Sequence, residues 1–160
     1  MTAPWPVAAL DPVRRLRVLA ASIPGATYAE EYLDIPYEQL WAYVDDVETS
    51  IPALITDVRS FRIVARHAAG ADPAERRLSA KAVGLLGNRG AFEVVLKPGW
   101  CLMQSRLVIG GMAATAEGAG TRFAGCGSLR FPGGRLLTKA VGATGGAERI
   151  VTRLRRELDR

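Results

Sequence analysis

Glu31 is the first residue whose position could support chemistry, because it is an acid among apolar neighbours. Between residues 26 and 35 apolar residues recur with a period of two, and Glu31 shares its strand face with Leu33 and Ile35. Burial on that face would favour a protonated carboxyl group, which is suited to general acid or base catalysis. The alternative is an ion pair between Glu31 and an arginine at the rim of a pocket.

His67 and Ser105 are the other polar residues on apolar strand faces. His67 is the single histidine of the chain, and imidazole exchanges protons near neutral pH. Alternation along its strand places His67 on the same face as Phe61 and Ile63, although a strand end beside a loop also suits an exposed histidine. Ser105 has no obvious base, so nucleophilic catalysis by its hydroxyl is not expected. Glu31 and His67 are therefore the candidate catalytic residues if the protein is an enzyme.

Potential metal ligands are few and poorly spaced. The acidic group Asp45, Asp46 and Glu48 lies at a helix end, but it lacks the spacing of a calcium-binding loop. Cys101 and Cys126 have no partner His or Cys at zinc spacing and are too few for a disulfide framework. We predict no metal, no cofactor and two buried free thiols.

The composition is that of a globular protein and limits the classes of partner. Of the 160 residues, 49% are hydrophobic and 23% are charged, a balance typical of one folded domain. The net charge of +5 is interrupted by acids, which indicates a solvated surface and no nucleic-acid partner. No apolar run approaches the roughly 18 residues of a membrane span, so stable membrane insertion is not expected. Residues 1–10 do not resemble a signal peptide, and a cytoplasmic location is predicted.

The apolar spacing predicts helices at both ends of the chain and strands between them. A helix starts at Asp11-Pro12, where Asp can cap and Pro fits the first turn, and it ends at Pro24-Gly25. A strand at 26–35 precedes helical segments at 37–47 and 51–55. An apolar stripe then predicts a terminal helix from Ala147 to Leu158. Extension of this helix back towards Leu136 is expected to break at Gly142, Gly145 and Gly146.

Between the short helices and the terminal helix, glycine and proline separate six strands. Short turns of this kind are typical of an antiparallel meander. The strands are expected at 58–68, 76–86, 90–97, 100–108, 112–117 and 121–130, with a bend at Gly110-Gly111 and an end at Pro132-Gly133-Gly134.

This order of elements predicts a curved sheet whose apolar concave face is covered by the terminal helix. A space between sheet and helix is a favoured place for a small molecule. Trp41 could stack on that molecule or pack beneath the helix pair, and the whole inventory could instead fill a core. The predicted ligand-binding residues are Trp41, Phe61, Ile63, Phe92, Val94, Met103, Ser105, Met112, Phe123, Ile150 and Leu154.

Two parts of the sequence resemble the SRPBCC superfamily, the START-related and pollen-allergen-like helix-grip proteins. The first part is YLDIPYEQLWAYVDDVE at 32–48 with IPAL at 51–54 and VRSFRIV at 58–64; the second is VLKPGW at 95–100 with GTRF at 120–123 and the terminal helix. The resemblance implies an α+β fold of the order β-α-α-β6-α. It assigns residues 26–160 to a helix-grip ligand-binding domain and residues 1–25 to an extension with an accessory helix.

Three functions remain open from the sequence. The first is binding of a hydrophobic small molecule such as a polyketide, lipid or aromatic metabolite. The second, also implied by the resemblance, is a polyketide cyclase or dehydratase that uses acid–base residues of the cavity. The third is an interaction module that docks through the basic N-terminal helix. A homodimer is compatible with all three.

Overall fold

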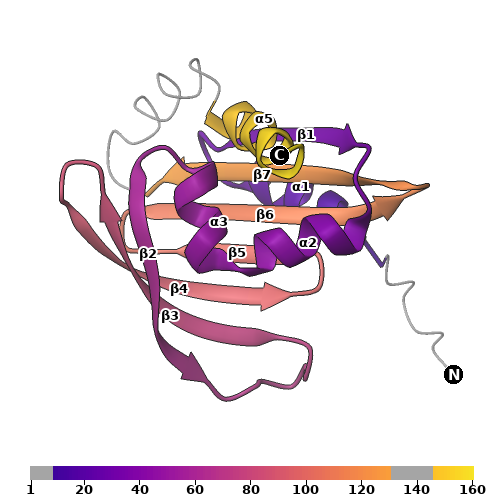
Figure 1. Cartoon of the computed structure of the whole chain (residues 1–160). Helices are drawn as coiled ribbons and strands as arrows, with labels where there is room; N and C mark the ends of the chain where they lie inside the picture. Colours follow the sequence, from indigo (N-terminus) through magenta and orange to yellow (C-terminus); the bar gives the residue numbers. More distant parts are fainter. Residues whose placement is uncertain (1–8, 131–145) are drawn as a thin grey trace, which may run out of the picture.

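The computed structural model describes residues 9–130 and 146–160. Two sequence predictions lie outside these residues: the turn at Pro132-Gly133-Gly134 and the interruption at Gly142 and Gly145. In the described part of the chain, a curved antiparallel sheet carries helices on both faces (Figure 1). The predicted α+β class is confirmed.

Seven strands form the sheet in the order β1-β7-β6-β5-β4-β3-β2. All neighbours are antiparallel, and β1 joins the far edge of the meander by pairing with β7. The strands are β1 (Thr27–Leu33), β2 (Val58–His67), β3 (Arg76–Gly84), β4 (Arg89–Lys97), β5 (Trp100–Gln104), β6 (Val108–Glu117) and β7 (Gly120–Leu129).

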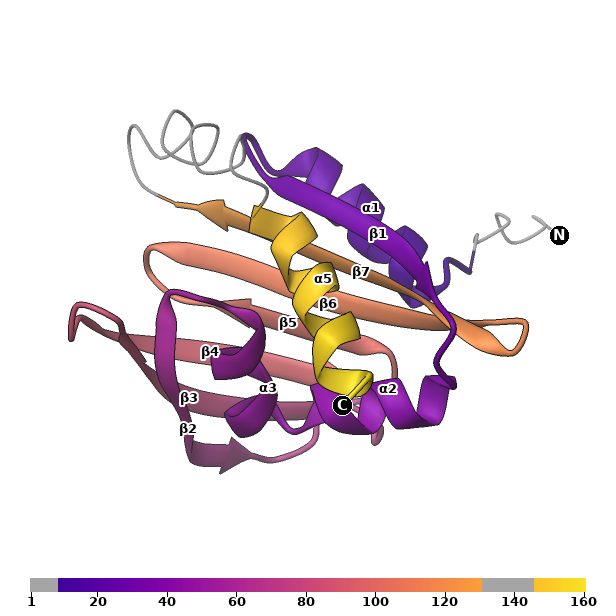
Figure 2. The ribbon, with the colours of Figure 1, turned by 45° about the horizontal axis from the view of Figure 1, so that its top comes forward.

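Among the described residues, three helices cover the concave face. Helices α2 (Tyr37–Asp45) and α3 (Val47–Leu54) lie over the sheet, and α5 (Gly146–Leu158) crosses it diagonally, as Figure 2 shows. The second short helix begins at Val47 rather than at the predicted Ile51, because the chain folds into it directly after α2: the Thr49 and Ser50 amides donate to the Asp46 carbonyl. The terminal helix is confirmed as the cover of the concave face.

Helix α1 (Pro12–Ser22) packs on the opposite, convex face. It begins as predicted, since the Asp11 carboxylate accepts a hydrogen bond from the Arg14 amide at 3.0 Å. On its outer side, Arg17 binds the Glu30 carboxylate at 2.7 Å, and the Tyr28 hydroxyl donates to the same carboxylate. The buried residues of α1 share a small core with residues of the neighbouring strands: Val13, Leu16, Ala20, Trp100, Ala113, Ala124 and Cys126.

The turn between β5 and β6 differs from the prediction. The chain turns at 105–107, where the Ser105 hydroxyl accepts hydrogen bonds from the Leu107 and Val108 amides at 3.2 and 3.0 Å. Gly110-Gly111, predicted as the bend, lies inside β6. Gly111 allows α1 to pack closely there, because a Cβ on it would stand 2.8 Å from a terminal carbon of the Leu16 side chain, which would have to shift.

Strand β2 contains two irregularities that strict alternation does not foresee. Ile63 pairs with Ala80, but Ala65 pairs with Ser79, so Val64 is an extra residue on β2. Such a β-bulge shifts the following side chains to the other face of the sheet. A similar shift occurs between Val58 and Ser60.

Candidate ligand-binding cavity

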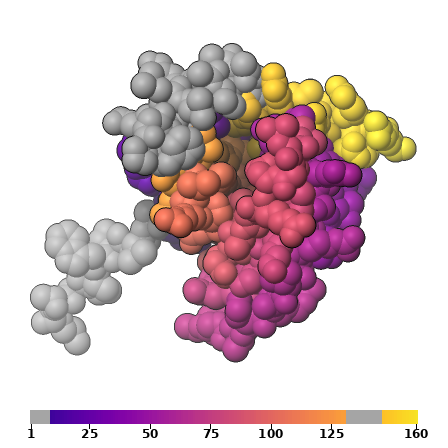
Figure 3. All heavy atoms as spheres, turned by 90° about the vertical axis from the view of Figure 1, so that its left-hand side faces the viewer, coloured from indigo at the N-terminus to yellow at the C-terminus, as the bar shows by residue number. Residues whose placement is uncertain are grey.

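A cavity of about 310 Å³ opens at one end of the concave face. It lies where β3 ends, β4 begins, β5 turns into β6 and α3 runs into β2, and we call this end of the sheet the mouth. Figure 3, which looks onto the mouth, shows the surface hollowed between the β3–β4 hairpin and the β5–β6 turn. The volume lies at the lower end of the roughly 300–1,000 Å³ typical of small-molecule sites.

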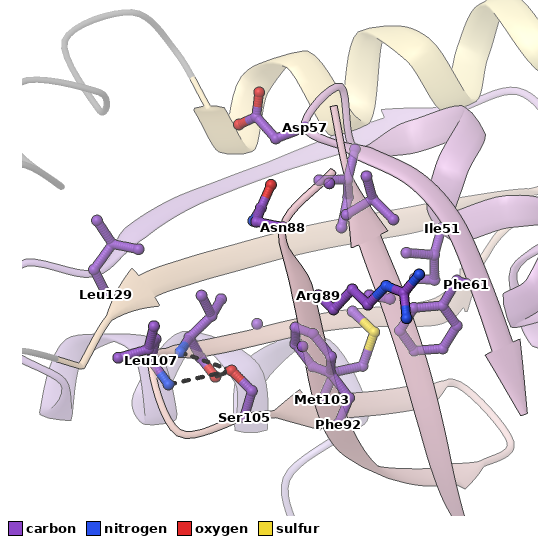
Figure 4. A pocket seen from close by; sticks show the side chains of 17 residues that line it. Ile51, Asp57, Phe61, Asn88, Arg89, Phe92, Met103, Ser105, Leu107 and Leu129 are labelled. Carbon is purple, nitrogen blue, oxygen red and sulfur yellow. Dashed lines mark hydrogen bonds between the residues drawn. The ribbon is translucent and has the colours of Figure 1, made fainter. Parts of the chain in front are cut away.

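Apolar side chains form most of the cavity wall. Phe61 and Phe92 contact each other with ring centroids 5.8 Å apart and planes inclined by 58°, a tilted geometry that aromatic pairs favour. Met103 lies beside them in Figure 4, and its flexible thioether suits an irregular ligand. The remaining apolar lining residues are Ile51, Ile55, Val58, Ala82, Gly84, Gly90, Leu107, Val108, Gly110 and Leu129.

A second hollow of about 340 Å³ adjoins the first. It lies between the loop after α3, the end of β7 and the first turn of α5, where Ile150 and Ala147 form part of its wall. The two hollows share four lining residues, which are Ile55, Asp57, Val108 and Leu129. The two hollows therefore lie side by side at the mouth.

Polar groups of the cavity concentrate at its rim. Asp57, Asn88 and Arg89 approach it from the α3–β2 loop and the β3–β4 hairpin (Figure 4). Ser105 also lines the cavity, but its hydroxyl already accepts the two amides of its own turn. The arrangement can bind the polar end of a molecule whose apolar body lies deeper.

The predicted ligand-binding residues separate into two groups. Phe61, Phe92, Met103 and Ser105 line the cavity, and Ile150 lines the second hollow. The others belong to the main hydrophobic core and line neither hollow, and Ile63 is the one among them that is only partly buried. They are Trp41, Ile63, Val94, Met112, Phe123 and Leu154.

Glu31 lies on the concave side but takes part in an ion pair. Its carboxylate binds the Arg155 guanidinium of α5, and both side chains are close to half exposed. The pair connects the edge strand β1 to the helix that covers the sheet. The ion pair with an arginine agrees with the predicted alternative, but Glu31 is not at the rim of the cavity, since it lines neither hollow. A catalytic role for Glu31 remains a prediction.

His67 lies on the convex face, and the expectation that it shares a face with Phe61 is wrong. The reason is the extra residue Val64, which reverses the alternation before the strand ends. The exposed imidazole of His67 hydrogen-bonds the Ser79 hydroxyl at 2.7 Å, and Ser79 in turn donates to Glu93 at 2.9 Å. This chain of polar groups lies on the other side of the sheet from the cavity.

Both cysteines are buried and free, as predicted. Burial raises the pKa of Cys101 to about 12 and that of Cys126 to about 11. Neither thiol is therefore an activated nucleophile. Within residues 9–130 and 146–160, no three His, Cys, Asp or Glu side chains come together in a way that could hold a metal ion.

Sequence analysis missed the residues that shape the mouth. Asp57, Asn88 and Arg89 were assigned to loops and turns without a role, because periodicity says nothing about loop side chains. Ile51 belongs to the short helix α3 and Ile55 directly follows it, and the orientation of that helix depends on packing. One available signal was the group of glycines that lie on the concave face at one end of the strands, including Gly90 and Gly110.

Comparison with known proteins gives a fold-level relationship. No family model and no curated protein sequence matches the chain. Among solved structures, the 18 kDa protein CC1736 from Caulobacter crescentus is 17% identical with a TM-score of 0.64, over 83% of this chain and 95% of that one. The protein TTHA0849 from Thermus thermophilus is 21% identical with a TM-score of 0.57, over 83% and 96%.

The chain has the helix-grip fold. A further similar structure is the di-domain ARO/CYC protein StfQ from the steffimycin biosynthetic pathway, 9% identical with a TM-score of 0.54 over 88% of this chain and 52% of StfQ. The fold that the resemblance to the SRPBCC superfamily implied is thereby confirmed. Of the helices in the described residues, none is long and apolar enough to cross a membrane.

Proposed function

We propose that this helix-grip protein binds a hydrophobic small molecule in the cavity at the mouth. The observation that carries the proposal is the apolar-lined space of about 310 Å³ beside Phe61, Phe92 and Met103. Native interiors are close-packed and rarely leave a space of this size without use. Burial of apolar ligand surface against this wall supplies about 25 cal/mol per Å².

The ligand that fits has an apolar or aromatic body and a polar end. Its body would lie against the aromatic pair, and its polar end would meet Asp57, Asn88 and Arg89 at the rim. A lipid, a polyketide or an aromatic metabolite satisfies this description. The adjoining hollow would accommodate a longer molecule.

Native mass spectrometry of the protein from its own source tests the proposal. We expect a stoichiometric apolar or aromatic compound, released on denaturation. Titration of the purified protein with the uncharged fluorophore N-phenyl-1-naphthylamine gives a second readout, with fluorescence enhanced on transfer to an apolar site. Protein that carries no compound and leaves the fluorophore unchanged would contradict ligand binding.

A polyketide cyclase is the second candidate, because the cavity rim holds a carboxylate. Asp57 lines both hollows and could exchange a proton with a bound polyketone. The di-domain ARO/CYC protein StfQ has a similar fold. Turnover of a linear polyketone that is lost in Asp57→Asn but kept in Glu31→Gln and His67→Ala would favour this candidate; binding without turnover in the unaltered protein would exclude it.

A further inference from the structure

Two leucines stand exposed at the tip of the β3–β4 hairpin. Leu86 is 97% exposed and Leu85 is 56% exposed. Leucine is unusual at such a position, because turns are mostly formed by polar residues, glycine and proline. The loop is a hydrogen-bonded turn: the Gly87 amide donates to the Gly84 carbonyl at 3.0 Å, and Gly87 has φ of +79°. This turn presents the two leucines outwards.

A third exposed leucine lies on the other side of the cavity opening. Leu107 is 52% exposed in the β5–β6 turn, which the Ser105 hydroxyl stabilises. In Figure 3 the two loops stand on either side of the hollow. The three exposed leucines thus belong to loops on two sides of the opening through which an apolar ligand would enter.

The two ends of the sheet differ in the sign of their charged residues. In the described loops, strand ends and first turn of α5 at the mouth (55–59, 84–90, 104–108, 129–130 and 146–150), five arginines accompany two carboxylates. In the described loops at the opposite end (33–38, 67–76, 97–100 and 117–120), five carboxylates accompany one arginine and one lysine. The arginines of the mouth are Arg59, Arg89, Arg106, Arg130 and Arg149.

We propose that the mouth docks on the surface of an anionic lipid bilayer, with Leu85, Leu86 and Leu107 inserted between headgroups and the arginines on the phosphates. Leucines exposed on two separate loops suit a lipid surface, which deforms around them, better than a protein partner, whose interface typically covers roughly 800 Å² per side. Cationic residues near an anionic bilayer strengthen binding, and salt weakens it. The proposal adds a partner to the proposed ligand-binding function, since a ligand could pass between bilayer and cavity without crossing water.

Co-sedimentation with vesicles tests the docking. The full chain should bind vesicles of phosphatidylcholine with phosphatidylglycerol more strongly than vesicles of phosphatidylcholine alone, and added salt should weaken binding. Leu85→Ser/Leu86→Ser should lower the partition coefficient by about tenfold for each leucine. Arg106→Gln should lower it by about fivefold.

The matched control uses the same kinds of change on α1. Val18 is 58% exposed and Arg14 lies on the same helix, so Arg14→Gln/Val18→Ser removes an apolar side chain and a charge away from the mouth. This control should bind vesicles like the unaltered chain. Equal vesicle binding by the folded Leu85→Ser/Leu86→Ser variant, or a loss confined to the α1 variant, would overturn the proposal.

A parallel titration separates this proposal from ligand binding itself. Leu85 and Leu86 do not line the cavity, so their serine variant should bind N-phenyl-1-naphthylamine as the unaltered chain does. Absence of fluorophore binding in every variant, with vesicle binding as expected, would refute the cavity function and leave the docking intact. Fluorophore binding with no vesicle binding in any variant would refute the docking alone.

Discussion

Filling the cavity from Gly110 is the most direct test of whether the space is used. Gly110 lies on β6 in the cavity wall, and its backbone φ is not positive. A Cβ added there would stand 3.6 Å from the Cys126 carbonyl oxygen and 3.9 Å from the Met103 methyl carbon, which are ordinary contacts. Gly110→Leu can therefore extend into the cavity, and Gly110→Ala serves as the control for the backbone effect.

The expected gain in stability follows from the carbons that leave water. Relative to Gly110→Ala, leucine adds three carbons at about 0.8 kcal/mol each. The loss of side-chain conformational entropy offsets about 0.5–1 kcal/mol of this gain. The net increase in the free energy of unfolding is about 1.5 kcal/mol, or about 3–6 °C in Tm for a chain of this length. A site without space would instead lose about 1–3 kcal/mol through overpacking.

The same substitution should weaken binding. The four side-chain carbons of leucine, each roughly as large as a water molecule of about 30 Å³, remove about 120 Å³ from a cavity of about 310 Å³. We expect the affinity for N-phenyl-1-naphthylamine to fall by at least about tenfold, while Gly110→Ala binds nearly normally. Urea unfolding and fluorescence titration measure the two effects. Lower stability together with unchanged binding would refute the assignment of the site to this cavity.

Three other outcomes follow from the described side chains. Glu31→Gln removes an exposed ion pair, so the free energy of unfolding should fall by no more than about 1 kcal/mol. Fluorophore binding should persist in both Glu31→Gln and His67→Ala. Loss of fluorophore binding in either variant would show that the substituted residue belongs to the site. Cys101 and Cys126, whose pKa values burial raises to about 12 and about 11, should react with Ellman's reagent only after unfolding; rapid labelling of native protein would contradict their burial. Burial opposes ionisation of Glu30, but hydrogen bonds from its arginine and tyrosine neighbours prevail and lower its pKa below 4.5. Its carboxylate therefore stabilises the fold above about pH 4.5, and urea unfolding should show that contribution lost at lower pH; an increase in stability there would contradict the sign.

The sequence was sufficient for the order of elements because each element has a clear period and clear ends. The change from period two to helical spacing at Tyr37 marks α2, and Asp11-Pro12 marks the start of α1. The covering role of α5 followed from its single apolar stripe and its place after the last strand. These are local properties of the chain, so no knowledge of packing was required.

The candidate site was less predictable because it depends on two non-local properties. The extra residue Val64 reverses the alternation of β2 and moves His67 to the convex face, and no residue type at 63–65 announces such a bulge. Which part of the concave face stays empty depends on how α2, α3 and α5 pack over it. Alternation identifies the face correctly for Phe61 and Phe123 alike, although one borders the cavity and the other is fully buried.

The size of concave-face side chains nevertheless changes along the strands in a way that explains the cavity. Towards the mouth, paired positions on neighbouring strands carry small residues: Ala82 faces Gly90, and Gly110 faces Gly127. Towards the opposite end the same strands carry large buried ones: Leu78, Leu96, Met112 and Phe123. Glycine inside a strand destabilises it by roughly 0.5–1 kcal/mol relative to alanine, so the sheet is weakened where the ligand space lies. That band of small residues is the feature of the site that is visible in the sequence. Gly110→Leu tests its role by placing one large side chain in the band.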